Sequence, residues 1–245
     1  MSLCAHHMTT QKFDALLLDL DGTLVDTLGD FVAALNAMLE DLLGPGNQGP
    51  VLALQAEDVT LMVGKGSEHL VQQALRWVES QWPIGLERPG HPGPDGLPLG
   101  AWALTRYLHH YARLNGLRST LYPGVEASLS RWHHAGLPLV CLTNKPERFA
   151  RDLLRQKNCL GFFEHVIGGD THEKKKPHPM PLLKACESLG TLPAHTCMVG
   201  DSVNDVQAAR AAGCPVILVS YGYNHGQPAY TAGADRVIDS LVELF

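Results

Sequence analysis

Asp19-Leu20-Asp21-Gly22-Thr23 directly follows the apolar run 13–18 near the start of the chain. The apolar run predicts a buried strand, and Asp21-Gly22 is typical of a turn directly after it. Because side chains alternate along a strand, the spacing places the carboxylates of Asp19 and Asp21 on the same side. Two acids so close together call for a cation or for a proton held between them. One can then act as a nucleophile while the other transfers protons, although an ordinary turn has the same sequence pattern.

Short apolar segments alternate with helical patterns over the C-terminal two thirds of the chain. The expected strands are 13–19, 138–143, 165–168, 196–200, 215–219 and 236–238, with helices at about 124–135, 146–158, 179–190 and 202–213. This alternation predicts a parallel sheet covered on both faces, which is an α/β fold with a Rossmann-like, doubly wound core. Ligands bind at the carboxyl ends of the strands in such a sheet.

Residues 27–117 interrupt the alternation. Apolar residues recur there at helical spacing in three stretches, 31–42, 70–78 and 104–114, with no predicted strand between them. We therefore expect an all-helical insert at 27–117, within a core formed by 13–26 and 118–245. A long Gly/Pro-rich stretch at about 85–100 predicts a mobile loop inside the insert, and a shorter one covers 44–50. Residues 1–12 are expected to be a leader or a disordered segment.

The composition is that of an ordinary globular chain, with 45% hydrophobic and 18% charged residues. The formal net charge of −6 provides no electrostatic footprint for nucleic acid or for an anionic membrane. No apolar stretch approaches a membrane span, and the N-terminus lacks the pattern of a signal peptide. The six cysteines form no close-spaced pairs, so we expect buried free thiols in a reducing cytoplasm.

Three more polar segments follow predicted strands of the same sheet. Thr143-Asn144-Lys145 comes at the end of the second strand, after residue 142, the run Lys174-Lys175-Lys176 follows the third, and Asp201 and Asp205 follow the fourth. Each segment alone has an ordinary explanation: a helix cap, a solvated loop, and carboxylates at a helix N-terminus. Together they gather acids, a hydroxyl and a lysine at one edge of the sheet, which suits Mg²⁺ and a phosphoryl group.

These segments match, in order, the four motifs of the haloacid dehalogenase superfamily, which the chain resembles from Phe13 onward. The matching residues are Asp19-Leu20-Asp21-Gly22-Thr23, Thr143, Lys176-Pro177 and Gly200-Asp201-Ser202-Val203-Asn204-Asp205. By this resemblance the helical insert is a cap that closes over the site. Further matches resemble the phosphoglycolate phosphatase branch, among them Val63-Gly64-Lys65-Gly66 and Tyr221-Gly222-Tyr223-Asn224. The long stretch 85–100 departs from the family pattern.

The resemblance implies an Mg²⁺-dependent phosphatase that hydrolyses a small phosphate monoester through an aspartyl-phosphate, with 2-phosphoglycolate as the expected substrate. It implies that Asp19 is the nucleophile and that Asp21 is the acid and base. The implied metal site comprises Asp19, Asp201 and the backbone carbonyl of Asp21, with Asp205 acting through water or by orienting Lys176. The implied phosphoryl site comprises Thr143, Lys176 and the backbone amides near Gly22 and Asn144.

Lys65 is a candidate for binding the carboxylate of a glycolate leaving group. It lies between Gly64 and Gly66, just before a helix that is expected to begin at about Ser67 and to present free amides. The alternative is that Lys65 is a solvated loop lysine without a function.

Other assignments stay open at this point. A phosphosugar phosphatase or mutase, or a pyrophosphatase, has the same scaffold, whereas a dehalogenase is disfavoured because it does not require Asp21. A receiver-like module that accepts phosphate on an aspartate is the non-enzyme alternative, but it has no helical insert after its first strand. The expected partner is a small phosphorylated metabolite, with no nucleic acid and no membrane. We expect a monomer or a homodimer.

Overall fold

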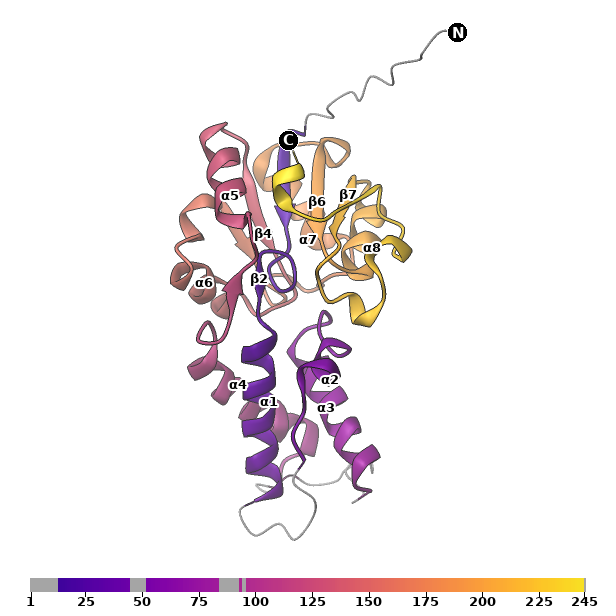
Figure 1. The fold of residues 1–245 in the computed structure, drawn as a ribbon. Helices are drawn as coiled ribbons and strands as arrows, with labels where there is room; N and C mark the ends of the chain where they lie inside the picture. Colours follow the sequence, from indigo (N-terminus) through magenta and orange to yellow (C-terminus); the bar gives the residue numbers. More distant parts are fainter. Residues whose placement is uncertain (1–12, 45–51, 84–92, 94–95, 245) are drawn as a thin grey trace, which may run out of the picture.

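The structure is a computed structural model that describes residues 13–44, 52–83, 93 and 96–244. The expected leader at 1–12 lies outside the described residues, as do most of the two Gly/Pro-rich stretches. Figure 1 shows an α/β core joined to a group of helices, α1 to α4, through the region of β2.

Six parallel strands form the core sheet in the order β5-β4-β1-β6-β7-β8. They are β1 (Ala15–Leu18), β4 (Leu139–Leu142), β5 (His165–Ile167), β6 (Thr196–Gly200), β7 (Val216–Val219) and β8 (Arg236–Ile238). All six strands expected from the sequence are present. The strand order reverses at β1, next to β6, and ligands bind at such a reversal in open α/β sheets.

Helices cover both faces of this sheet. Leu16 and Leu18 of β1 belong to the apolar cluster that includes α5 (Val125–His134) and α6 (Glu147–Gln156). Leu17 points to the opposite face and belongs to the cluster that includes α7 (Met180–Leu189) and α8 (Val203–Ala212). The alternation along β1 therefore packs one helical layer on each face, which confirms the doubly wound α/β fold.

The described residues between β2 and β3 form α1 (Leu28–Leu43), α2 (Ala56–Thr60), α3 (Ser67–Gln81) and α4 (Leu99–Leu114). They share an apolar cluster, to which α1, α3 and α4 all contribute buried side chains and which Phe149 and Tyr223 of the core join. The named elements in the described part of the insert are therefore helices, as expected. Helix α4 begins at Leu99, so the last residues of the expected loop belong to this helix, and the short α2 was not expected.

A two-stranded antiparallel ribbon joins the cap to the core. Its strands are β2 (Val25–Asp26) and β3 (Thr120–Leu121), and they pair directly before and after the cap helices. Next to the ribbon, the buried carboxylate of Asp30 accepts hydrogen bonds of 2.7 Å from the amides of Gly116 and Arg118. The two chain segments that connect cap and core are thus fixed to each other.

Short 3₁₀ segments complete the described chain: η1 (Leu160–Phe162), η2 (Pro193–His195), η3 (Asn224–Gly226), η4 (Ala229–Thr231) and η5 (Leu241–Glu243). None of the helices in the described ranges combines the length and the hydropathy needed to cross a membrane.

Candidate active site

The polar residues singled out in the sequence gather at the carboxyl ends of the central strands. Asp19 follows β1, Thr143 follows β4 and Asp201 follows β6, each directly after the last residue of the strand. Lys176 lies in the segment between β5 and α7, and its side chain reaches the same place. The parallel sheet therefore brings together groups that are far apart in the sequence.

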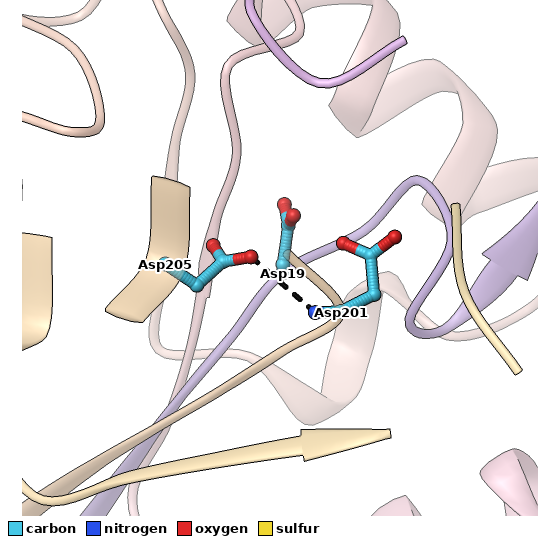
Figure 2. Close-up of side chains that lie close together, drawn as sticks. All are labelled: Asp19, Asp201 and Asp205. Atoms are coloured by element: carbon cyan, nitrogen blue, oxygen red, sulfur yellow. Dashed lines mark hydrogen bonds between the residues drawn. The ribbon is translucent and has the colours of Figure 1, made fainter. Parts of the chain in front are cut away.

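Three carboxylates form a tight cluster at this edge. One oxygen from each of Asp19, Asp201 and Asp205 lies within 4.8 Å of the others, and Figure 2 shows Asp19 between Asp205 and Asp201. Asp205 lies in the first turn of α8, where its Oδ2 accepts hydrogen bonds from the amides of Asp201 and Ser202 and from the Ser202 hydroxyl. The helix N-terminus thus fixes one acid of the cluster, while its neighbours have fewer partners.

Lys176 is the cation that contacts this cluster. Its side chain is 2% exposed, and Nζ lies 2.7 Å from Asp205 Oδ1 and 3.0 Å from Asp19 Oδ1. Nζ also donates to the backbone carbonyl of Leu142 at 2.8 Å. Burial alone would lower the pKa of Lys176, but the carboxylates of Asp19 and Asp205 hold it above its usual range. Lys176 is therefore charged, and its hydrogen bonds fix its position beside Asp19.

The cluster contains three carboxyl groups but only one contacting ammonium among the described residues, that of Lys176. Burial raises the pKa of Asp19 to about 7; Lys176 opposes this shift and Asp205 adds to it. Burial also raises the pKa of Asp201, and the neighbouring Asp205 and Asp19 raise it further. Three carboxylates beside one ammonium provide oxygen ligands for a hard divalent cation, which would favour their ionised forms.

The side chain of Asp21 points away from this cluster. Its Oδ1 accepts a hydrogen bond of 2.8 Å from Lys145 Nζ, so Asp21 contributes no side-chain oxygen to the group of three acids. Asp19 and Asp21 nevertheless line the same pocket, as their spacing predicts. Asp19 is therefore part of the acid cluster, whereas Asp21 is paired with Lys145, which also contacts Tyr111 of the cap.

Lys145 is the residue that sequence reasoning missed. It is buried, and its ammonium contacts Asp21 and the hydroxyl of Tyr111, which lies on α4 of the cap. Two signals could have found it. Lys145 directly follows Thr143 and Asn144 at a strand end, and Tyr107 and Tyr111 place two phenol rings four residues apart on one helix face.

Thr143 and Asn144 line the same pocket, and Gly22 lies in the turn that follows Asp21. Thr143 Oγ1 accepts a hydrogen bond from the amide of Lys145 at 3.2 Å. Asn144 Nδ2 donates to the carbonyls of Gly64 and Lys176, each at 2.9 Å, and so connects the cap with two core segments. Gly22 has a φ of +83°, and a Cβ there would lie 2.4 Å from Asp201 Oδ2. Only glycine fits that turn without displacing Asp201.

The cap supplies the other wall of the pocket. Its described lining residues are Phe31, Val63, Gly64, Gly66, Ser67, Leu70, Tyr107 and Tyr111. Helix α3 begins at Ser67, as expected, so its N-terminus faces this pocket. Most of these side chains are apolar, and they enclose a small polar site.

Lys65 lies elsewhere. Its side chain is exposed and lines a surface hollow together with Lys174, Lys175 and residues of the 176–179 segment, whereas the pocket that contains Asp19 is lined by its neighbours Gly64 and Gly66. Lys65 is therefore not among the residues that line the pocket with Asp19, and Lys176 is the candidate site residue with which it shares a hollow. The basic side chain in that pocket is Lys145.

Comparison with known proteins places this site in a family. The model of the haloacid dehalogenase-like hydrolases matches residues 13–213. A phosphoglycolate phosphatase of Thiobacillus denitrificans is 39% identical over 229 residues, which cover 94% of this chain and 92% of that one. A phosphoglycolate phosphatase of Chromobacterium violaceum is 40% identical over 238 residues, covering 97% of each chain.

A solved structure has the same architecture. The crystal structure of a predicted phosphoglycolate phosphatase from Haemophilus somnus superposes with a TM-score of 0.84 at 29% sequence identity, and the match covers 97% of each chain. The similarity extends over core and cap together.

Proposed function

The chain belongs to the haloacid dehalogenase-like hydrolase family and is a phosphatase, and we propose that it hydrolyses 2-phosphoglycolate to glycolate and phosphate. The substrate is proposed from the relatives, which carry that name at 39 and 40% identity over nearly the whole chain. The observation that carries the chemistry is the arrangement of Asp19, with Lys176 on one side and Asp21 lining the same pocket.

Asp19 and Asp21 divide the proposed reaction between them. An Asp19 oxygen attacks phosphorus, the ester P–O bond breaks, and a proton moves from Asp21 to the leaving oxygen of glycolate. Asp21 then accepts a proton from a water molecule that attacks the aspartyl-phosphate, which releases phosphate and restores Asp19. The separation of the two side chains supports this division, because Asp19 lies beside Lys176 and Asp21 beside Lys145.

The residues present fit Mg²⁺. Asp19 and Asp201 offer carboxylate oxygens of raised pKa, and we propose that the backbone carbonyl of Asp21 completes the protein ligands. The oxygens of Asp205 already accept hydrogen bonds from Lys176, Ser202 and two amides, which supports an indirect role through water or Lys176. When bound, Mg²⁺ would supply positive charge to the phosphoryl oxygens.

The remaining residues hold the phosphoryl group in this proposal. Thr143, the amides near Gly22 and Asn144, and the ammonium of Lys176 are its donors. This assignment is supported by the position of these groups at the strand ends, close to Asp19. The ammonium of Lys176 is held there by Asp205. Charge that develops on the transferred group would then be stabilised by donors already in place.

We assign residues 27–117 to the cap and 13–26 with 118–245 to the core. We propose that the chain acts as a monomer or as a homodimer. The cysteines that the structure describes are free and buried, which supports a cytoplasmic location.

Phosphate release from a panel of small phosphate esters tests the proposed function. We expect 2-phosphoglycolate to have the highest kcat/KM, and we expect activity to disappear in excess chelator and to return with Mg²⁺. A chain that releases no phosphate from 2-phosphoglycolate with Mg²⁺ present would contradict the proposed substrate. Full activity in chelator would contradict the proposed metal.

A further inference from the structure

Lys145 is buried in the pocket, yet the roles proposed above leave it without a function. Its side chain is 2% exposed, and Nζ lies 2.8 Å from Asp21 Oδ1 and 2.5 Å from the Tyr111 hydroxyl oxygen. The ammonium also lies 4.8 Å from the ring centroids of both Phe31 and Tyr111. A core lysine thus meets an acid of the reaction on one side and aromatic residues of the cap on the other.

This ammonium can bind one more anion. Burying a charge is costly unless an opposite charge and hydrogen bonds compensate for the lost water. The hydrogen bonds to Asp21 and Tyr111 use two of the three N–H groups of Lys145, and no acceptor for the third is found within the described part of the chain. The aromatic faces attract the cation but do not replace an oxygen acceptor.

The chemistry of the pocket places that anion next to the leaving oxygen. Lys145 is the basic side chain among the described residues that line the pocket. The nearby ammonium of Lys176 already contacts Asp19, Asp205 and the carbonyl of Leu142. A phosphate ester with its phosphorus at Asp19 has its leaving oxygen at Asp21. In an ester of a 2-hydroxy acid the carboxylate is attached one carbon beyond that oxygen. Lys145, in contact with Asp21, is then within reach of this carboxylate.

We propose that Lys145 binds the carboxylate of the leaving group and thereby selects phosphate esters of small 2-hydroxy acids. This inference rests on the proposed function and deepens it, because it names the residue that distinguishes such esters from neutral ones. Phe31, Tyr107 and Tyr111 line the pocket with aromatic rings, and an ion pair is stronger against such rings than in bulk water.

The contact between Lys145 and Asp21 also links recognition of the substrate carboxylate to proton transfer. In the free enzyme, Asp21 is the counter-ion of Lys145. A substrate carboxylate at Lys145 would therefore lie next to the acid that serves its own leaving oxygen. A proton moves from Asp21 to that oxygen as the P–O bond breaks and the bond from Asp19 to phosphorus forms. A neutral leaving group makes no ion pair with Lys145.

The test compares wild type and Lys145→Met on two substrates, 2-phosphoglycolate and ethyl phosphate, which has two carbons but no carboxylate. We expect kcat/KM for 2-phosphoglycolate to fall by about 10- to 100-fold and that for ethyl phosphate by less than about threefold. Glycolate should also lose its potency as an inhibitor of Lys145→Met, whereas inhibition by inorganic phosphate should persist. An equal loss on both substrates would overturn the inference, because Lys145 would then act only through Asp21.

Two further lysine variants sharpen the comparison. Lys184→Met is the matched control, because the side chain of Lys184 is 53% exposed on α7, and it should match wild type on both substrates. Lys65→Met tests the competing assignment made from the sequence. A loss selective for 2-phosphoglycolate in Lys65→Met but not in Lys145→Met would overturn the role of Lys145.

A measurement on the wild type keeps the test independent of whether the Lys145 variant folds. Glycolate should inhibit much more strongly than glycolamide, which has the same size without the charge. Equal inhibition would overturn carboxylate recognition. The proposed function fails separately, on the wild type alone, if ethyl phosphate is hydrolysed as efficiently as 2-phosphoglycolate. If the wild type prefers 2-phosphoglycolate and Lys145→Met retains that preference, only the inference fails.

Discussion

Asp19 lies 3.0 Å from the ammonium of Lys176, yet burial raises its pKa to about 7. The proposed reaction needs this carboxylate in its charged form, both to attack phosphorus and to bind a metal. Asp201, whose pKa burial also raises, faces the same requirement. Protons and Mg²⁺ therefore compete for the same oxygens, and binding of the metal releases protons.

We expect the apparent affinity for Mg²⁺ to fall as the pH falls through 7. A raised pKa means that the folded protein holds the proton of Asp19 below about pH 7 and has lost it well above that pH. For this group alone, the dissociation constant should rise about tenfold from pH 8 to pH 6. Isothermal titration calorimetry in two buffers of different ionisation enthalpy measures both the constant and the proton release. A dissociation constant that does not change between pH 6 and pH 8 would contradict this account.

The sequence predicted where the acids Asp19, Asp201 and Asp205 lie, but it did not single out Lys145, the second lysine of the site. Asp19, Asp201 and Asp205 follow apolar strand patterns, so their convergence follows from the topology of a parallel sheet. Lys145 was assigned no role, because its surroundings depend on Phe31 and Tyr111, which lie in a different part of the chain. No local pattern shows which cap side chains will meet a given residue of the core.

The ribbon of β2 and β3 shows the same limit among secondary structure elements. The six core strands and the long helices have clear apolar periodicity, and the structure contains them. Strands of two residues are too short to show a periodic pattern, so no pattern in the sequence predicts β2 and β3. The short α2 was missed for the same reason. Of these short elements, β2 and β3 pair directly before and after the described cap helices.

Asp30 fixes this junction, and we expect Asp30→Ala to lower the free energy of unfolding by about 2–3 kcal/mol. The substitution leaves the amides of Gly116 and Arg118, which now donate to the buried carboxylate, without their partner. Urea denaturation of wild type and variant measures the difference. Asp152→Ala serves as the control, because its ion pair with Arg155 is exposed and its loss should change the stability by less than about 0.5 kcal/mol. If Asp30→Ala changed the free energy of unfolding as little as Asp152→Ala, the junction would not depend on this carboxylate.

The pocket forms between the core, which has an apolar cluster on each face of its sheet, and the cap, whose cluster also includes Phe149 and Tyr223 of the core. Contacts between these parts complete it: Asn144 donates to the carbonyl of Gly64, and Lys145 donates to the hydroxyl of Tyr111. The core supplies the acids and the cap supplies most of the walls. The sequence predicted both parts, but their mutual fit is a property of the whole chain, and substrate selection is proposed to arise there.

The location of a trapped phosphoryl group tests the central claim, that Asp19 is the nucleophile, most directly. Asp21→Asn should retain Asp19 but lack the base for hydrolysis, so the aspartyl-phosphate should accumulate with an ester whose leaving group needs no acid, such as 4-nitrophenyl phosphate. Acid quenching followed by peptide mass spectrometry locates the group, with Asp19→Asn as the control that should show none. We predict one phosphoryl group on the peptide that contains Asp19. Phosphate on any other residue, or a burst of nitrophenol without phosphate on Asp19, would contradict the account.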